Sequence, residues 1–385
     1  MISRDGIVLK KDSIIGILKN IYGMMRFLIQ MPKNIQRIRR YVTSNSYYPE
    51  LSRKSNGEIW FENLNYLFKN GEVNPYYLSY GFDVKNFRNQ TEFLTHREFI
   101  KIRDRGNQTC KKTGTGDYNS IVLLRDKYLF ANYLGKVLGE KYVVPTVALK
   151  SEKMVYYVRD KQWYDLRKLI EDGTTRVYKV IDGECADGVM LVSVEKNQII
   201  IDGKKYSVEG FFALIENQRL IVQDVVEQHD AFKAFKTKCV NTIRLVTIKG
   251  KTGAVGVFSA FLRLSQDSES FVDNRAKGGL GIGINLDTGK LMKYGLPHDA
   301  YGIKTEVHEL SGIRFQDYQI PFWKETVELA CSAHRQFYDI QSIGWDIVIT
   351  EKGPVLLEGN DDWEIGGPQD TFGGLKKRWD ELTNA

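Results

Sequence analysis

The sequence predicts an α+β fold in which mixed, mostly antiparallel sheets follow an N-terminal helical extension. Short apolar runs separated by turns favour hairpins, and the Asp202–Gly203 pair inside 198–208 is a sequence that two-residue hairpin turns prefer. A second hairpin is expected over 281–295, and two closing strands are expected over 344–350 and 353–360. Helical periodicity is limited to a few longer runs, and most of the other apolar runs have the length of strands.

The first 42 residues are predicted to form a basic amphipathic arm. They contain nine Lys or Arg and two Asp, whereas residues 43–385 contain 46 basic and 46 acidic residues. Lys19 and Arg26 interrupt the apolar run at 14–41, which argues against a transmembrane helix. An apolar helix with cations at intervals favours binding to an anionic membrane surface, with packing on the protein's own core as the alternative. The neutral remainder argues against a nucleic-acid partner, because basic residues would then line a groove across the fold.

Cysteine and histidine usage limits the kinds of site that the chain could carry. The four cysteines are scattered without a C-x-x-C pair, and the five histidines are also scattered. This pattern argues against a disulfide framework, a cysteine zinc site and a histidine metal cluster. Because the sequence shows no secretory signal, we expect a cytoplasmic protein whose arm binds the inner face of the cell membrane.

The remaining elements are predicted from helical spacing and apolar runs. A helix is expected over 120–140 with Gly139 as its C-cap, and a strand follows at 143–149. Another helix is expected over 163–172, before the hairpin strands, and a last one over 322–337.

A strand that ends in clustered oxygen atoms is the strongest functional signal. Glu358 and Asn360 alternate at the end of 353–360, so their side chains project to the same side. Asp346 lies on the preceding strand of the same predicted hairpin. An isolated E-x-N sequence is more often a turn and helix-cap set. Together with the strand aspartate, two carboxylates and an amide oxygen indicate a Mg²⁺ site completed by phosphate oxygens and water.

Two lysines are candidates for phosphate binding. Lys179 ends a predicted strand that enters a loop containing Gly183 and Gly188. Glycine lets backbone N–H groups approach phosphates closely, and lysine supplies a point charge. A hairpin with a solvated lysine explains the same pattern. Lys127, in the 120–140 helix, is either a second phosphate lysine or a solvated helix residue.

Two arginines interrupt strand-like runs that are otherwise apolar. Arg244 and Arg263 are costly within strands unless each is paired or faces a cleft. Either one alone could lie on the solvent side of a half-exposed strand. Because both precede one glycine-rich loop, 273–279, they favour an anion-binding face.

The order of these features resembles the ATP-grasp superfamily. Its members share a helix Lys, a strand Lys with a glycine-rich loop, a hinge strand, strand Arg residues and a terminal D-x(11)-E-x-N pattern. The segments NTIRLVT, VDNRAKGG, IPFW and GWDIVIT…GPVLLEGN look like the sugar-transfer-associated branch, found among bacterial surface-polysaccharide genes. The resemblance covers roughly residue 120 to the C-terminus and leaves 1–115 uncovered.

The resemblance implies an ATP-grasp fold with a lid subdomain and a C-terminal subdomain built on a mixed or antiparallel sheet. The chain would then divide into the basic arm, a mostly helical N-terminal region, a linking helix and strand, the lid, and the metal-binding C-terminal subdomain. The expected boundaries are 1–42, 43–115, 116–145, 146–226 and 227–385.

The resemblance also implies roles for the acidic and basic candidates. Asp346, Glu358 and Asn360 would bind Mg²⁺ ions that bridge the ATP phosphates, with Mn²⁺ as an alternative ion. Lys127 and Lys179 would hold those phosphates from the central and lid parts of the fold.

Other residues would contact the base and the reacting groups. The loop of Gly183 and Gly188 would close over the phosphates, and the hinge strand would place Gln223, Asp224 and Val226 against adenine. Three residues would face or support the transferring phosphoryl group and the acyl phosphate: Arg263, Asn274 and Arg244.

These roles imply an ATP-dependent carboxylate–amine ligase that forms an amide through an acyl phosphate. Its carboxylate and amine substrates would be small molecules, sugar- or lipid-linked, in bacterial surface polysaccharide or glycoconjugate biosynthesis. Two alternatives stay open: a phosphotransferase in which a sugar hydroxyl accepts the phosphoryl group, and a non-catalytic nucleotide-binding scaffold for glycosyltransferases.

Overall fold

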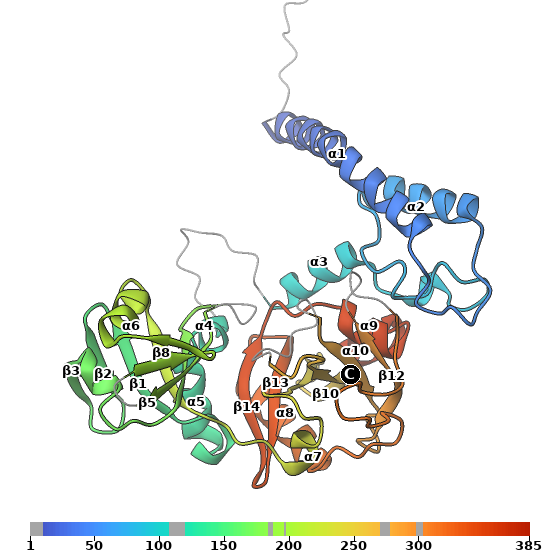
Figure 1. The fold of residues 1–385 in the computed structure, drawn as a ribbon. Helices are drawn as coiled ribbons and strands as arrows, with labels where there is room; N and C mark the ends of the chain where they lie inside the picture. Colours follow the sequence, from blue (N-terminus) through green and yellow to red (C-terminus); the bar gives the residue numbers. More distant parts are fainter. Residues whose placement is uncertain (1–10, 108–119, 184–187, 196–197, 270–277, 298–302) are drawn as a thin grey trace, which may run out of the picture. The chain divides into compact units, whose positions relative to one another are not determined.

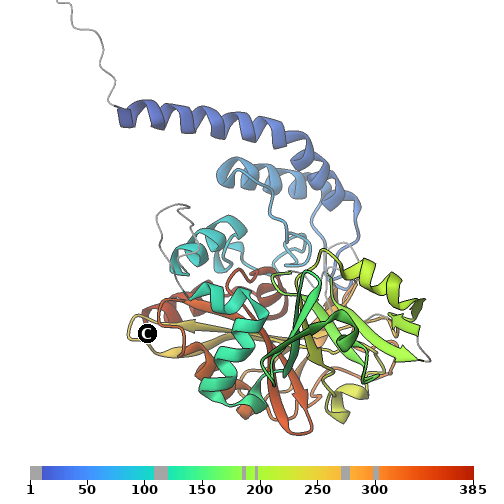
Figure 2. The same ribbon diagram turned by 90° about the vertical axis from the view of Figure 1, so that its left-hand side faces the viewer.

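The computed structural model describes residues 11–107, 120–183, 188–195, 198–269, 278–297 and 303–385. The chain divides into two compact units, coloured along the sequence in Figures 1 and 2. The first comprises Met1–Arg88 and Thr95–Arg97, and the second comprises Asn89–Leu94 and Glu98–Ala385.

The first unit is helical, as the predicted extension requires. Helix α1 (Lys11–Thr43) packs against α2 (Asn56–Asn70), and both are blue in Figure 1. Helix α2 begins with a capping box, because the Ser55 side chain accepts from the Glu58 N–H and the Glu58 side chain accepts from the Ser55 N–H. It ends at Gly71, whose φ of 78° is the left-handed conformation that favours glycine. Within the described ranges, no helix is long and apolar enough to cross a membrane.

An eight-stranded antiparallel sheet forms one part of the second unit. Its strand order is β3-β2-β1-β8-β4-β5-β6-β7, and its apolar core includes Phe211 of helix α6 packed on Tyr178. Asp202 and Gly203 both have positive φ, as a type I′ turn requires, so this predicted hairpin is confirmed. The elements are β1 (Thr146–Ser151), β2 (Met154–Tyr157), β3 (Gln162–Asp165), β4 (Arg176–Val180), β5 (Met190–Glu195), β6 (Gln198–Ile201), β7 (Lys204–Tyr206), α6 (Val208–Ile215) and β8 (Leu220–Asp224).

The helix predicted over 163–172 is wrong. Strand β3 occupies the start of this segment and pairs with β2. The chain then forms only a short 3-10 helix, η3 (Leu166–Leu169), which Asp165 caps by accepting from the Arg167 N–H at 2.9 Å. The single turn of η3 accounts for the helical spacing of the apolar residues in this segment. The pairing of β3 with β2, just before η3, prevents a longer helix.

A six-stranded antiparallel sheet carries the second core. Its strand order is β12-β11-β10-β9-β13-β14, and among the described residues each of its strand pairings is antiparallel. The strand expected over 143–149 corresponds to β1 of the eight-stranded sheet, which begins at Thr146. Val143, before β1, makes an isolated parallel bridge with Leu356 of the six-stranded sheet. The strands are β9 (Ile243–Lys249), β10 (Val255–Leu264), β11 (Leu280–Ile284), β12 (Leu291–Pro297), β13 (Ser342–Thr350) and β14 (Gly353–Asn360). The helices are η1 (Gln90–Glu92), α3 (His96–Gly106), α4 (Ile121–Arg125), α5 (Lys127–Leu138), η2 (Glu140–Tyr142), α7 (Asp230–Lys233), α8 (Trp323–His334), α9 (Gly366–Phe372) and α10 (Lys376–Asn384).

The helix predicted over 120–140 is interrupted at Asp126, which separates α4 from α5. Asp126 is extended, with φ −84° and ψ 111°, and its carboxylate accepts from the N–H groups of Tyr128 and Leu129. These bonds satisfy N–H groups that lack partners at a helix start. The helical spacing of apolar residues on both sides of Asp126 therefore conceals a break between two helices, while Gly139 caps α5 as predicted.

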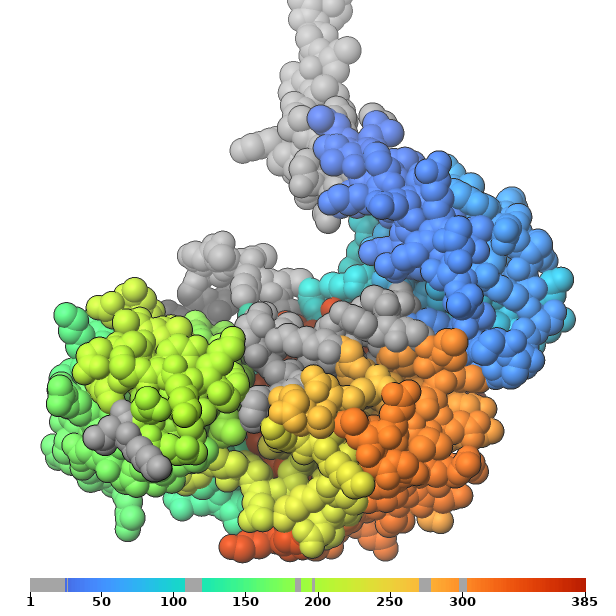
Figure 3. All heavy atoms as spheres, in the orientation of Figure 1, coloured from blue at the N-terminus to red at the C-terminus, as the bar shows by residue number. Residues whose placement is uncertain are grey.

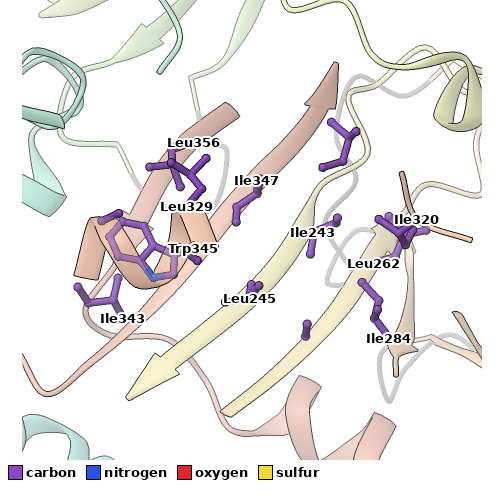
Figure 4. Packing of buried hydrophobic residues seen from close by; sticks show 14 of the residues in the cluster. Ile243, Leu245, Leu262, Ile284, Ile320, Leu329, Ile343, Trp345, Ile347 and Leu356 are labelled. Carbon is purple, nitrogen blue, oxygen red and sulfur yellow. The ribbon is translucent and has the colours of Figure 1, made fainter. Parts of the chain in front are cut away.

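One face of the six-stranded sheet forms the apolar core. Ile343, Trp345 and Ile347 of β13 are fully buried on this face beside Leu245 of β9. Leu329 of α8 covers them, as Figure 4 shows. Because side chains alternate along a strand, the residues between these project to the opposite face.

Candidate active site

The opposite face of this sheet carries a row of charged side chains. In the strand register, Arg244 of β9 lies opposite Asp346 of β13, and Asp346 lies opposite Glu358 of β14. Directly paired residues project to the same side of a sheet, so the three side chains are neighbours. Asn360 lies two residues after Glu358 and projects to that side as well.

Asp346 is the most buried member of this row, with 2% of its surface exposed. Its Oδ1 accepts from Arg244 Nε at 2.6 Å, and its Oδ2 accepts from Arg244 Nη2 at 3.0 Å and from Arg263 Nη1 at 3.1 Å. Burial by itself raises the pKa of Asp346, but the charges of Arg244 and Arg263 outweigh it and hold that pKa well below its usual range. Asp346 is therefore ionised and paired with both strand arginines.

Glu358 has the opposite electrostatic environment although it lies beside Asp346. Burial and the negative charge of Asp346 raise the pKa of Glu358, and the two carboxyl groups hydrogen-bond to each other. Asn360 donates from Nδ2 to the Gly344 carbonyl at 3.2 Å, so its own Oδ1 is the atom left to accept or coordinate. A proton on Glu358 removes its repulsion with Asp346, and a cation bound between the two carboxyl groups would have the same effect.

This donor set fits a hard divalent cation. Two adjacent ionised carboxylates repel each other, and a bound Mg²⁺ would remove that repulsion. Asp346 already accepts three guanidinium N–H groups, so Glu358 and Asn360 have more lone pairs to offer. In the part of the chain that the structure describes, no group of three or more His, Cys, Asp or Glu is arranged to hold a metal. Phosphate oxygens and water would therefore supply the remaining ligands.

Lys127 and Lys179 approach the carboxyl pair from α5 and β4. The Lys127 ammonium donates to the Gly183 carbonyl at 2.5 Å, which ties the start of α5 to the loop after β4. Lys179 lies within electrostatic reach of Glu358, Asp346 and Lys127. Burial lowers the pKa of Lys179, and repulsion by Lys127 lowers it further, while the attraction of both carboxylates opposes these effects. The structure therefore brings both predicted lysines and two predicted acids into one electrostatic cluster.

The other residues predicted to bind nucleotide lie in or beside the eight-stranded sheet and in the hinge segment that follows β8. Gly188 has a φ of 72°, which favours glycine at this position. Gln223 is buried and donates from Nε2 to the Val144 carbonyl at 3.3 Å, so its side chain supports the hinge instead of facing a ligand. Asp224 is exposed and Val226 is half-buried. The side chains of Asp224 and Val226 are thus accessible, unlike that of Gln223.

The predicted anion-binding face consists of two guanidinium groups that share one carboxylate. Arg244 and Arg263 are both half-buried and both pair with Asp346, which leaves one net positive charge in this trio. Asn274, which was predicted to act with them, lies outside the described residues.

The comparison with protein families agrees with this geometry. Residues 115–382, well over half of the chain, match the family described as sugar-transfer associated ATP-grasp. The chain belongs to this ATP-grasp family. The match confirms the predicted α+β, ATP-grasp fold class and the family resemblance. A search of curated proteins finds no match to the chain.

Solved ATP-binding enzymes are similar to this ATP-grasp chain at low identity. N5-carboxyaminoimidazole synthetase from Staphylococcus aureus, complexed with ADP, is 14% identical, with a TM-score of 0.39 over 67% of this chain and 50% of that one. L-amino acid ligase from Bacillus licheniformis is 12% identical, with a TM-score of 0.35 over 67% and 45%. The biotin carboxylase domain of Hydrogenobacter thermophilus 2-oxoglutarate carboxylase, with MgADP and bicarbonate, is 11% identical, with a TM-score of 0.37 over 70% and 48%. The chain spans about half the length of these structures.

Sequence reasoning missed an asparagine that joins the two strands of the site. Asn107 is fully buried, and its Nδ2 donates to the carbonyls of Ser342 at 2.8 Å and Asp361 at 2.7 Å. Its Oδ1 accepts from the N–H groups of Ser342 at 2.9 Å and Gln341 at 3.1 Å. One side chain therefore fixes the start of β13 to the residue that follows Asn360.

Two arginines hold the same segment. Arg103 of α3 donates from Nη1 to the carbonyls of Asp362 at 2.6 Å and Trp363 at 2.8 Å. Arg125 of α4 makes a bidentate pair with the buried Asp361, with both N–O distances 2.9 Å. The Asp361 carboxylate thus has a structural partner and anchors the end of β14, while Asp362 is held through its backbone carbonyl. Arg103 and Asn107 precede the family match, which starts at residue 115, and no local pattern in the sequence marks them.

Proposed function

We propose that this ATP-grasp protein is an ATP-dependent carboxylate–amine ligase that forms an amide through an acyl phosphate. The observation that carries the proposal is the row of Arg244, Asp346 and Glu358 within electrostatic reach of Lys127 and Lys179. Two lysines beside a carboxyl pair that could hold a divalent cation would together stabilise the charge of ATP phosphates. This arrangement supports phosphoryl transfer by positioning and electrostatics, without a side-chain nucleophile.

Each group has a part in this proposal. Asp346, Glu358 and Asn360 would hold Mg²⁺, which when bound neutralises and orients the ATP phosphates. Lys127 and Lys179 would balance the charge of phosphate oxygens. The Lys127 bond to the loop after β4 would couple phosphate binding to the position of that loop, because a phosphate would compete for the same ammonium group.

The reaction has two steps with balanced bonds. An oxygen of the substrate carboxylate forms a bond to the γ-phosphorus while the bond between that phosphorus and the β–γ bridging oxygen breaks, so ADP leaves. The amine nitrogen then attacks the carbonyl carbon of the acyl phosphate, loses a proton, and displaces inorganic phosphate. Arg263, whose guanidinium pairs with Asp346, would stabilise the oxyanion of this second step.

We propose carbohydrate-linked carboxylates as substrates, in bacterial surface polysaccharide or glycoconjugate biosynthesis. The family's description as sugar-transfer associated supports this assignment. A uronic acid paired with an amino acid amine, or the reverse arrangement on an amino sugar, satisfies the chemistry of both steps.

The proposal is tested with a carboxylate labelled with ¹⁸O. The purified full chain is incubated with MgATP and pairs drawn from uronic acids and amino acids, and release of ADP and phosphate is measured. The proposal predicts that release requires both substrates, that an amide forms in equal amount, and that one ¹⁸O atom enters the released phosphate. Release with a hydroxyl sugar alone, yielding a sugar phosphate, would instead establish the phosphotransferase.

A matched pair of lysine variants checks that the measured activity uses this site. Lys179→Met should lower turnover by at least a hundredfold, because it removes a charge that opposes phosphate repulsion. Lys205→Met changes an exposed lysine in the same sheet and should leave turnover unchanged. Equal activity of the two variants, or ATP binding without turnover for every substrate pair, would contradict the proposal.

A further inference from the structure

Helix α1 exposes a stripe of large apolar side chains. Met25, Leu28 and Ile29 are 55%, 59% and 73% exposed, whereas Ile38 and Tyr41, farther along the helix, are fully buried. Helical spacing places the three exposed side chains on the side opposite the two buried ones. In the sequence, the same spacing continues upstream at Ile14, Leu18 and Ile21. Exposed apolar stripes of this size mark an interaction surface.

The cations of α1 flank this stripe. Lys33, Arg37 and Arg39 are exposed, and within the described ranges no ion pair involves them. Helical spacing puts Lys33 and Arg39 on the same half of the helix as Leu28 and Ile29, whereas Arg37 lies nearly opposite Leu28. Residues 1–42 carry nine basic and two acidic residues, a net charge of +7. This is also the net charge of the whole chain. Apolar and cationic groups are therefore concentrated together on one element.

Helix α2 adds aromatic side chains to the surface of this unit. Phe61 and Phe68 are 73% and 69% exposed. The Phe68 ring lies 6.1 Å from that of Phe27, which helical spacing places on the side of α1 opposite the exposed stripe. In Figure 3 the blue side chains of α1 and α2 form one surface. Phe61 and Phe68 therefore form an apolar patch separate from the Met25–Leu28–Ile29 stripe.

We propose that the Met25–Leu28–Ile29 stripe and its flanking cations bind an anionic lipid surface. The charge selects this occupant. A second copy of the chain meeting this face symmetrically would bring two identical cationic surfaces together, whereas anionic headgroups attract them. The stripe supplies insertion and the cations supply the attraction, as in helices that lie in the membrane interface. This inference does not depend on the proposed ligase activity.

The test is cosedimentation of the full chain with vesicles. Vesicles of phosphatidylcholine alone are compared with vesicles containing phosphatidylglycerol. We expect binding to the anionic vesicles that weakens as salt is raised, and at least tenfold weaker binding to the neutral ones. Absence of binding to anionic vesicles, or equal binding to both compositions, would overturn the proposal.

Two paired variants separate insertion from charge. Leu28→Ser/Ile29→Ser should weaken binding by at least about tenfold, since two apolar side chains no longer leave water. Lys33→Gln/Arg39→Gln should weaken it by roughly thirtyfold at low salt, from about 1 kcal/mol for each cation. The matched Lys204→Gln/Lys205→Gln pair changes exposed cations elsewhere and should bind as the parent does. Loss with the charge pair but not with the apolar pair would overturn insertion, and a dimer that Leu28→Ser/Ile29→Ser dissociates would identify a second copy as the occupant instead.

Discussion

The two faces of strand β13 show how one element serves folding and chemistry. Ile343, Trp345 and Ile347 project into a core that excludes water completely. Asp346, between the last two, projects the other way into a network of two arginines and a second carboxyl group. The charged face depends on the packed face, because packing fixes the strand positions that bring the charged side chains together. We therefore expect the free energy of unfolding to depend mainly on Ile343, Trp345 and Ile347. We expect ligand binding to depend on Asp346.

The largest expected effect comes from the packed face. Trp345→Ala removes a fully buried indole whose Nε1 donates to Thr247 Oγ1 at 2.8 Å. The lost contacts and the cavity should lower the free energy of unfolding by about 3–5 kcal/mol. Urea denaturation followed by circular dichroism measures this. Tyr338→Ala, at a residue that is 85% exposed, is the control and should change the free energy by less than about 0.5 kcal/mol.

Acid should act next on the packed face through a buried histidine. His334 Nδ1 lies 2.7 Å from Thr247 Oγ1 and its Nε2 lies 3.1 Å from the Ile340 carbonyl. Burial lowers the pKa of His334 to about 4. Between the unfolded pKa of about 6.5 and the folded pKa, only the unfolded state binds the proton. Stability contributed by neutral His334 should therefore be complete above pH 6.5 and decline by about 3 kcal/mol as pH falls to 4.

The matched variant for this pH effect is His334→Gln. It should be less stable than the parent at pH 7 but should lose less stability between pH 6.5 and 4, because the titrating group is absent. If urea denaturation at several pH values gives the same slope for both proteins, His334 is not the group responsible.

A smaller effect is expected at the edge where the two faces meet. Asn107→Ala leaves buried carbonyl and N–H groups of β13 and the Asp361 segment without their partner. We expect a loss of about 2–3 kcal/mol in unfolding free energy. We also expect weaker MgATP binding, since Asn360 directly precedes Asp361. Asn217→Ala, at an exposed asparagine, is the control for both measurements. Unchanged nucleotide affinity in Asn107→Ala would show that the clamp does not position the site.

Local patterns predicted the parts of the site that lie close in sequence. Alternation on a hairpin placed Glu358 and Asn360 together, and the short turn brought Asp346 opposite Glu358. The pairing of Arg244 with Asp346 depends on β9 lying between β10 and β13, across 102 residues, so periodicity alone could not give it.

Other features were hidden because side-chain chemistry overrides apolar spacing. Asp126 ends α4 and caps α5 within one stretch of helical spacing, and Asp165 ends strand β3 and caps the single turn of η3. Asn107 acts on residues more than 230 positions away, so nothing near it in the sequence announces its role. Its hydrogen bonds follow from the assembled sheet and not from any motif.

The smallest change in stability should accompany a large change in ligand binding at Glu358. Glu358→Gln keeps the side-chain shape but removes a carboxyl group whose pKa is raised by burial and by Asp346. Without that unfavourable charge, the variant should be as stable as the parent or slightly more stable. It should bind Mg²⁺ poorly, because an amide replaces a carboxylate ligand.

Thermal unfolding with and without MgATP tests this most directly. The parent should melt at a higher temperature when MgATP is added, because a ligand that binds only the folded state stabilises it. Glu358→Gln should melt at or above the temperature of the unliganded parent and should show little or no further rise with MgATP. An equal rise in both proteins, or a variant that melts several degrees lower without ligand, would contradict the assignment of Glu358 to the metal and nucleotide site.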